Sequence, residues 1–197
     1  MTFGYELEAF SKYGLAIPIK LGLISHPNAL LTGSSGSGKS KSLLLLIGKL
    51  LQVFPGIILF LCDFKSSTDF AFLKGYAHYY AGDDCYSGMM AYYARFSEVR
   101  KSGRSDKRFL LVCDEYPALI NYLQMKDKAN KTKLANDVLG AVAEILMLGR
   151  GIGFGFWCVT QRPDSALFSN GARDNFMVVC ALGRLSKEQK AMVFPGQ

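Results

Sequence analysis

A glycine-rich loop between an apolar run and a helix-forming run constrains the fold of this chain more than any other feature. The loop reads Gly33-Ser-Ser-Gly-Ser-Gly-Lys39-Ser40 and matches the pattern G-x-x-x-x-G-K-[ST] in full. The run Ala29–Leu31 before it is typical of a buried strand, and the leucine- and lysine-rich residues 38–51 after it predict a helix. A strand that turns directly into a helix through such a loop indicates an α/β fold.

The composition of this loop suits the binding of phosphate groups. Glycines let the backbone wrap around an anion without Cβ clashes, and backbone N–H groups and the helix N-terminus then point at its negative charge. We expect Lys39 to reach the β- and γ-phosphates of ATP and the Ser40 hydroxyl to ligate Mg²⁺. The expected nucleotide contacts are Gly33, Ser34, Ser35, Gly36, Ser37, Gly38, Lys39, Ser40 and Lys41.

A second apolar run ends in two acidic residues. The segment Phe109–Asp114 reads FLLVCD and is followed directly by Glu115. Strands that merely end in solvated carboxylates are common, but this one lies downstream of a complete phosphate loop. In ATPases with such a loop the first acid holds magnesium, and the second polarises the attacking water. The sequence therefore predicts Asp114 as a metal ligand and Glu115 as the catalytic base.

Apolar strand-like runs alternate with helical patterns along the rest of the chain. Further strands are expected at Ile57–Asp63, Tyr76–Tyr80, Phe154–Thr160 and Phe176–Leu182, and helices at Ser87–Lys101 and Thr132–Arg150, with a short closing helix capped by Ser186. This alternation predicts a mostly parallel sheet covered by helices on both faces. Residues 1–27 are expected to form a lead-in strand and turn, and residues 28–197 the main domain.

Charge and cysteine content narrow the partners and the compartment. The net charge of +7 favours an acidic partner such as nucleic acid. The five cysteines show no metal spacing, and Cys62, Cys113, Cys158 and Cys180 fall inside strand-like runs. They are typical of reduced core residues in a cytoplasmic protein rather than of a disulfide framework. No apolar stretch reaches the ~20 residues of a membrane span, so no direct membrane insertion is expected.

Several motifs follow one another in a recognisable order. They are His26-Pro-Asn-Ala-Leu-Leu-Thr-Gly33, Cys62-Asp-Phe-Lys65, Val112-Cys-Asp-Glu-Tyr-Pro-Ala-Leu119, Leu148-Gly-Arg-Gly-Ile-Gly153 and Val159-Thr-Gln-Arg-Pro163. In this order the chain resembles the FtsK/SpoIIIE branch of the FtsK-HerA superfamily, the DNA-pumping P-loop ATPases. The Thr-Gln-Arg-Pro segment is the most specific piece, and Phe64 stands where that family usually has proline. Residues 172–176 and 182–187 are similar to coupling-protein relatives from mobile elements of Gram-positive bacteria.

The resemblance implies a RecA-like core that hydrolyses ATP as a hexameric ring around double-stranded DNA. It would couple mobile-element or plasmid DNA to transfer, with a membrane-anchored or relaxase partner. Gln161 would sense the γ-phosphate, and Arg150, Arg173 and Arg184 are candidates for a finger that reaches a neighbouring subunit's ATP. Of these we prefer Arg173. A compact motor core is expected, without a membrane anchor or winged-helix domain and ending at Gln197 before a final strand.

Two basic segments compete for the DNA-facing surface. Arg100–Arg108 precedes the catalytic strand, so it is expected at the edge of the sheet away from the nucleotide. A loop over Lys126–Lys133 follows the helix that begins after Glu115, where ATP hydrolysis could move it. We therefore expect DNA contacts from Lys126, Lys128, Lys131 and Lys133. The alternative is a solvated loop whose lysines only keep the protein soluble.

Three functions remain open at this point. The first is a DNA translocase motor, and the second is a protein-export ATPase of the kind found in type VII secretion. The third is a regulatory module that binds ATP without hydrolysing it. The intact pair Asp114-Glu115 argues against the third, and the basic segments favour nucleic acid over protein export.

Overall fold

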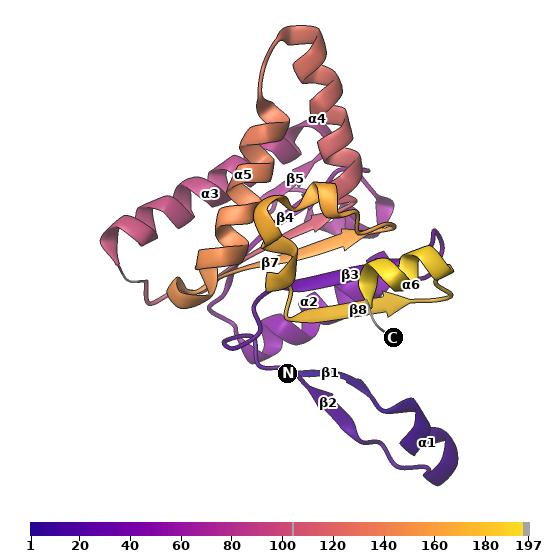
Figure 1. Cartoon of the computed structure of the whole chain (residues 1–197). Coiled ribbons are helices and arrows are strands. Elements are labelled where there is room, and N and C mark those ends of the chain that lie inside the picture. Colours follow the sequence, from indigo (N-terminus) through magenta and orange to yellow (C-terminus); the bar gives the residue numbers. More distant parts are fainter. Residues whose placement is uncertain (104, 195–197) are drawn as a thin grey trace.

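The computed structural model describes residues 1–103 and 105–194 and is built around one parallel sheet (Figure 1). The six strands lie in the order β5-β4-β6-β7-β3-β8, and every neighbouring pair is parallel. They are β3 (Ala29–Gly33), β4 (Ile58–Asp63), β5 (Tyr79–Ala81), β6 (Phe109–Asp114), β7 (Phe154–Thr160) and β8 (Val178–Leu182). The predicted α/β fold is confirmed, and its parallel strands lie within two residues of their expected starts except β5.

Helices cover both faces of this sheet, as its sequence predicts. They are α2 (Lys39–Val53) on one face, and α3 (Cys85–Ser102), α4 (Tyr116–Asn130) and α5 (Leu134–Leu148) on the other. Alternate residues of β6 show the division, because Leu111 packs into the core under α3 to α5 whereas Leu110 and Val112 pack toward α2. All residues of β3, β6 and β7 are buried, which explains their unbroken apolar runs.

Strand β7 lies between the strand that carries the phosphate loop and the strand that carries the acidic pair. It pairs with β3 through Thr32 and Thr160, and with β6 through Cys113 and Cys158. The backbones of β3 and β6 are therefore about 10 Å apart, which is two strand spacings. Because β7 ends between these two strands, Gln161, the residue that follows it, lies between the phosphate loop and the acidic pair.

The buried side chain of Asn28 fixes the start of β3. Its amide nitrogen donates to the carbonyls of Leu146 (3.3 Å) and Asn175 (3.1 Å), and its oxygen accepts from the Phe156 N–H at 3.0 Å. Since the side chain is fully buried, these bonds satisfy a polar group that would otherwise be costly. Asn28 thus links the lead-in to the phosphate loop with the end of α5 and with β7.

The prediction of a loop over Lys126–Lys133 is wrong for most of that segment. Helix α4 continues through Asn130, so Lys126 and Lys128 are helical. The run contains no glycine or proline, and lysine and alanine are good helix formers. The helix ends where Lys131 takes a left-handed conformation, and Asp127 then accepts from the N–H groups that begin α5. The two helices form a hairpin that projects from the sheet (Figure 1).

The first residues of the chain form a small separate unit. Strands β1 (Thr2–Tyr5) and β2 (Pro18–Lys20) pair antiparallel and flank helix α1 (Leu7–Tyr13), away from the main sheet (Figure 1). The lead-in strand was expected, but α1 was not. The helix has 7 residues, of which only Ala9 is buried, and a pattern this short does not reveal a helical period.

The closing helix α6 (Lys187–Val193) begins where it was expected. Ser186 caps it, and Gln189 completes the capping box. The five cysteines are free, and Cys62, Cys113 and Cys158 are buried in strands as expected. Cys180, also in a strand, is only half-buried, and Cys85 is buried at the start of α3. Among the described residues, no helix is long and apolar enough to cross a membrane. Arg104 and the expected chain end at residues 195–197 lie outside the described part.

Candidate nucleotide-binding site

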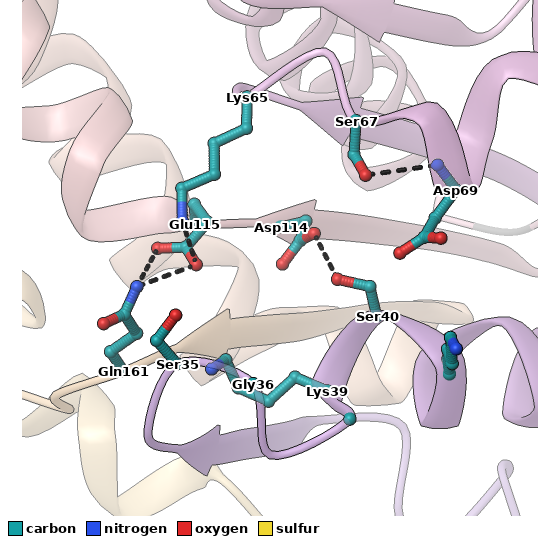
Figure 2. A pocket seen from close by; sticks show the side chains of 12 residues that line it. Ser35, Gly36, Lys39, Ser40, Lys65, Ser67, Asp69, Asp114, Glu115 and Gln161 are labelled. Atoms are coloured by element: carbon teal, nitrogen blue, oxygen red, sulfur yellow. Dashed lines mark hydrogen bonds and ion pairs between the residues drawn. The ribbon is translucent and has the colours of Figure 1, made fainter.

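A cleft of about 450 Å³ opens at the carboxyl ends of the central strands, where ligands bind in open parallel sheets. Figure 2 shows the phosphate loop on one side of it and the ends of β4 and β6 on the other. The residues that line it are Ser35, Gly36, Gly38, Lys39, Ser40, Lys41, Lys65, Ser67, Asp69, Asp114, Glu115 and Gln161. The fold therefore brings most of the sequence-predicted site residues into one cavity.

The phosphate loop needs its glycines for two separate reasons. Gly36 and Gly38 have φ angles of 75° and 87°, in the left-handed region that other residues rarely adopt. Gly33 is required by close approach, because a Cβ there would lie 2.4 Å from the carbonyl oxygen of Leu182. The same Cβ would lie 2.6 Å from the hydroxyl of Ser37. The predicted contacts Gly33, Ser34 and Ser37 therefore shape the loop without lining the cleft.

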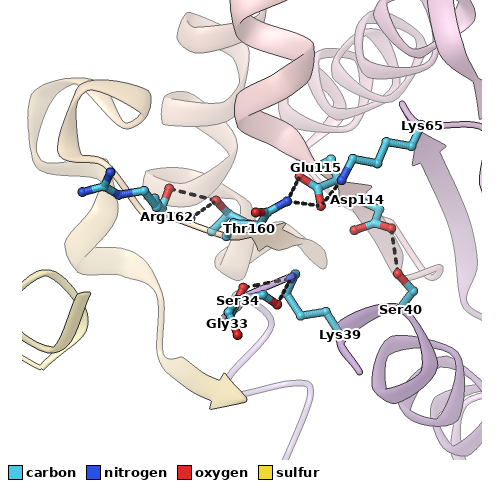
Figure 3. A network of polar contacts seen from close by, with 10 residues as sticks. Gly33, Ser34, Lys39, Ser40, Lys65, Asp114, Glu115, Thr160 and Arg162 are labelled. Atoms are coloured by element: carbon cyan, nitrogen blue, oxygen red, sulfur yellow. Dashed lines mark hydrogen bonds and ion pairs between the residues drawn. The ribbon is translucent and has the colours of Figure 1, made fainter. Parts of the chain in front are cut away.

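Lys39 opens helix α2 and folds back over the loop. Its ammonium donates to the carbonyls of Gly33 and Ser34, both at 2.8 Å (Figure 3). The residue is only 7% exposed, and burial lowers the pKa of its ammonium, while the charges of Glu115 and Asp114 oppose that shift. A buried cation held by loop carbonyls is positioned for an anion seated in the same loop.

Ser40 and Asp114 face each other across the cleft. The hydroxyl of Ser40 donates to Oδ2 of Asp114 at 3.3 Å, and Asp114 Oδ1 is buried without a hydrogen-bond partner among the described residues. Hydroxyl and carboxylate oxygens are the ligands that Mg²⁺ accepts, usually beside phosphate oxygens and water. The two side chains therefore fit a magnesium ion that bridges helix α2 and strand β6.

The electrostatics of Asp114 also fit a metal ligand. Burial raises the pKa of this carboxyl to about 6, and the neighbouring charges of Glu115 and Asp63 add to the shift. The hydrogen bond from Ser40 and the ammonium of Lys65 oppose it. A divalent cation at this place would stabilise the ionised form, because it offsets both the burial and the like charges.

Glu115 follows Asp114 in a strained backbone conformation. Its φ of 58° is left-handed, which is uncommon for a residue other than glycine and typical of functional sites. The turn points its carboxylate into the cleft, where Oε1 pairs with the Lys65 ammonium at 2.7 Å. The side-chain amide of Gln161, which directly follows β7, donates to the two carboxylate oxygens at 3.2 and 3.4 Å (Figure 2).

Gln161 is itself held from its backbone. The carbonyl oxygen of Gln161 accepts from the hydroxyl of Thr32 at 3.4 Å and from the amide of Gln189 at 3.0 Å. Its position therefore depends on the phosphate-loop strand and on helix α6. These two hydrogen bonds link Gln161 to strand β3 and to the closing helix α6.

Two site residues carry roles that the sequence alone did not assign. Asp63 ends β4 beside Asp114, is fully buried, and accepts from the Ser67 N–H at 2.7 Å and the Tyr79 hydroxyl at 2.9 Å. Burial raises the pKa of Asp63, and these hydrogen bonds oppose the shift. Lys65 is the second residue, and its ammonium pairs with Glu115. The motif Cys62–Lys65 was visible in the sequence, but only the order of strands shows that this motif lies next to the acidic pair.

The candidate arginines do not line this cleft. Arg173 lies in a 3₁₀ segment (Ser169–Asn175) beside a separate cavity of about 240 Å³ that includes Asp174. Arg150 borders another cavity, of about 180 Å³, with Lys107 and Arg108 at the amino ends of the strands. Arg184 is exposed after β8. A role for any of them across a subunit boundary stays a prediction.

The four lysines of the predicted DNA-facing segment differ in their surroundings. Lys126 pairs with Asp83 at 3.0 Å and lies over the ring of Tyr122. Lys128, Lys131 and Lys133 are exposed near the tip of the α4–α5 hairpin. Of the other basic segment, Lys107 and Arg108 lie where they were expected, because they border a cavity that shares no residue with the nucleotide cleft.

The phosphate loop, the acidic strand end and the glutamine on the intervening strand define a RecA-like P-loop ATPase fold. No family model matches the chain. It is 32% identical over 88 residues to the FtsK domain-containing protein YdcQ of Bacillus subtilis, which is 45% of this chain and 17% of that protein. The resemblance to the FtsK-like P-loop ATPases that the motifs predicted is thus confirmed.

Solved structures with the same fold come from two kinds of system. The conjugation coupling protein TcpA of pCW3, solved as a monomer with ATPγS, has a TM-score of 0.69 at 23% identity over 90% of this chain and 54% of its own. The cytoplasmic domain of the type VII secretion ATPase EccC of Thermomonospora curvata has a TM-score of 0.70 at 20% identity, over 98% and 24%. The chain thus spans about half of the length of TcpA and about a quarter of the length of the EccC domain.

Proposed function

We propose that this chain binds ATP with Mg²⁺ and hydrolyses it, and that hydrolysis moves double-stranded DNA. The observation that carries the proposal is the convergence of three strand ends on one cleft. The phosphate loop follows β3, Asp114 and Glu115 follow β6, and Gln161 follows β7. The domain that begins at Asn28 would be the motor.

The residues divide the reaction between them. The backbone N–H groups of the phosphate loop and the ammonium of Lys39 bind the phosphates, and Ser40 and Asp114 hold the metal ion. Mg²⁺ supplies neutralisation of the charge that develops on the phosphate oxygens. Glu115 accepts a proton from the attacking water, and Gln161 orients the same carboxylate and the water. Lys41 lies at the edge of the cleft, where it adds positive charge.

The DNA step is supported by charge and by likeness. The net charge of +7 attracts a polyanion, and TcpA is described as a conjugation coupling protein. We propose that several copies of the chain assemble around the duplex, with Arg173 of one copy serving the nucleotide of the next. The exposed lysines Lys128, Lys131 and Lys133 would face the DNA, at the end of the helix that starts at Glu115.

Protein export is the second candidate. The likeness to EccC covers 98% of this chain at a TM-score of 0.70, which matches the likeness to TcpA. The fold therefore serves both functions equally well. The two candidates differ in one property, because only a DNA motor should hydrolyse ATP faster when duplex DNA is present.

The test is ATP hydrolysis measured with and without duplex DNA over a range of salt concentrations. Replacing Lys128, Lys131 and Lys133 with glutamine should abolish DNA stimulation and leave basal hydrolysis intact. Each lost phosphate contact should flatten the slope of log binding constant against log salt by about 0.9. Lys126 is left in place because it already pairs with Asp83.

A matched variant carries glutamine at Lys101, Lys107 and Arg108, at the opposite edge of the sheet. Loss of stimulation in this variant alone would move the DNA contact to the amino ends of the strands. If the unaltered protein hydrolyses ATP without any response to DNA, the protein-export function gains over the DNA motor. If it does not hydrolyse ATP, the proposed reaction itself is wrong.

A further inference from the structure

The catalytic carboxylate of Glu115 is held by two donors from two different strand ends. Lys65, just after β4, places its ammonium 2.7 Å from Oε1, and the amide of Gln161 donates to both oxygens (Figure 2). The ammonium therefore competes for the carboxylate oxygens that must accept a proton from water.

The base of the Lys65 side chain is fixed, whereas its end is free to move. The backbone around it is anchored because Asp63 accepts from the Ser67 N–H at 2.7 Å and from the Tyr79 hydroxyl at 2.9 Å. The Lys65 side chain is 53% exposed, against 12% for Glu115. A lysine ammonium on a flexible four-carbon stem can change partners within its reach at little cost.

Lys65 and Lys39 enter the same cleft from opposite sides. Figure 2 shows Lys39 below the cleft on the phosphate loop and Lys65 above it, with its end turned toward Glu115. Lys39 is buried and held by two loop carbonyls, so its place is fixed. A terminal phosphate in this cleft would offer the mobile ammonium of Lys65 a partner with more negative charge than one carboxylate.

We propose that Lys65 reads the terminal phosphate of ATP by exchanging Glu115 for it. While Lys65 pairs with Glu115, the carboxylate is engaged by the ammonium. When a terminal phosphate takes the ammonium, the oxygen Oε1 of Glu115 is released to accept the proton from water. The inference rests on the proposed function and adds to it separate roles for the two lysines of the cleft. Lys39 holds any nucleotide with a β-phosphate, and Lys65 distinguishes ATP from ADP.

The first experiment measures nucleotide affinity rather than turnover. Dissociation constants for ATPγS and for ADP are determined with Mg²⁺ in the unaltered protein, in Lys65→Gln and in Lys74→Gln. Lys65→Gln should weaken the binding of ATPγS about tenfold, which corresponds to about 1.4 kcal/mol, and the binding of ADP by less than about twofold. Lys74 is an exposed lysine of the same β4–β5 connection outside the cleft, so Lys74→Gln should change neither.

A second experiment tests the exchange itself. Glu115→Gln removes the competing negative charge, so ATPγS should bind more tightly than to the unaltered protein. The gain should vanish in the double variant Lys65→Gln/Glu115→Gln, because no ammonium remains to be released. Lys65→Arg, which keeps the charge, should retain most of the preference for ATPγS over ADP.

The outcomes separate this inference from the function on which it rests. Equal loss of ATPγS and ADP affinity in Lys65→Gln, or no loss of either, would overturn the exchange while nucleotide binding stands. An identical gain from Glu115→Gln with and without Lys65 would also overturn it. If the unaltered protein binds neither nucleotide, the proposed function fails first. Melting temperatures of all variants verify that they are folded.

Discussion

The two ends of the central sheet have opposite characters. At the carboxyl ends, acids and cations meet in one cleft, where Asp114 is buried, Lys39 is buried and Lys65 pairs with Glu115. At the amino ends, the cavity beside Arg150 also contains Lys107 and Arg108, with Asp106 as its acidic residue. The first end holds charges against each other at short distance, and the second presents mainly positive charge.

The difference shows how one fold separates two kinds of anion contact. Charges in a buried cleft interact strongly because little water screens them, and their geometry is set by strand ends and the phosphate loop. Exposed basic side chains are screened by salt and act mostly through their number. Reactions that require charged groups at fixed short distances should therefore occur only at the carboxyl ends of the strands. Three substitutions test this.

Lys39→Ala should remove nucleotide binding and, with it, turnover. In the proposed complex, two hydrogen bonds from the Lys39 ammonium to phosphate oxygens would contribute about 1.5–3 kcal/mol each, so the dissociation constant should rise at least about 100-fold. Titration of ATPγS and of ADP by calorimetry measures the loss. Lys107→Ala at the amino ends is the matched control and should bind both nucleotides as before. Equal losses in the two variants would mean that the two ends are not functionally distinct.

Glu115→Gln should keep nucleotide binding and lose hydrolysis. The amide leaves Ser40 and Asp114 unchanged but cannot accept a proton, and loss of a general base lowers turnover about 10²–10⁴-fold. Phosphate release at saturating ATP measures the effect. Glu144→Gln removes a carboxylate that pairs with Arg100 and Tyr93 away from the cleft, and its turnover should stay normal. Turnover at the unaltered rate in Glu115→Gln would show that the base is another group.

Magnesium affinity should fall as the pH drops below about 6. The pKa of Asp114 is raised to about 6 by burial and by Glu115 and Asp63, and protons compete with the ion for its carboxylate. Affinity should therefore fall by about tenfold per pH unit below the pKa and level off above it. Mg²⁺ titrations in the presence of ADP between pH 5 and 8 measure this. In Asp114→Asn affinity should be weak throughout, without this pH dependence.

The same shift has a consequence for stability without the metal. A carboxyl with a raised pKa in the folded protein binds more protons there than in the unfolded chain, between its ordinary pKa and about 6. The stability should therefore decrease as the pH rises through this window, and Mg²⁺ should restore it above about 6. Melting temperatures with and without Mg²⁺ report the effect, and Asp114→Asn should remove it.

Local patterns of residues were enough to predict the parallel sheet, the phosphate loop and the acidic pair. These features follow from local physics, since short apolar runs between polar residues, such as Phe109–Asp114, are typical of buried strands and Gly33–Ser40 needs its glycines. The lysine-rich segment after residue 125 shows the limit of such patterns. Its charges predicted a loop, but nothing in it breaks the helix, and α4 continues to Asn130.

Which strand ends meet could not be predicted from such patterns and follows from the order of strands in the folded sheet. Strand β7 lies between β3 and β6, and this order brings Gln161 to Glu115 although the two are far apart in the sequence. It also places Lys65, after β4, against the same carboxylate, while Arg173 lies beside a different cavity. The order depends on how whole helices share the two faces of the sheet, and no single segment encodes it. The reactive contacts of the site are therefore set by long-range packing.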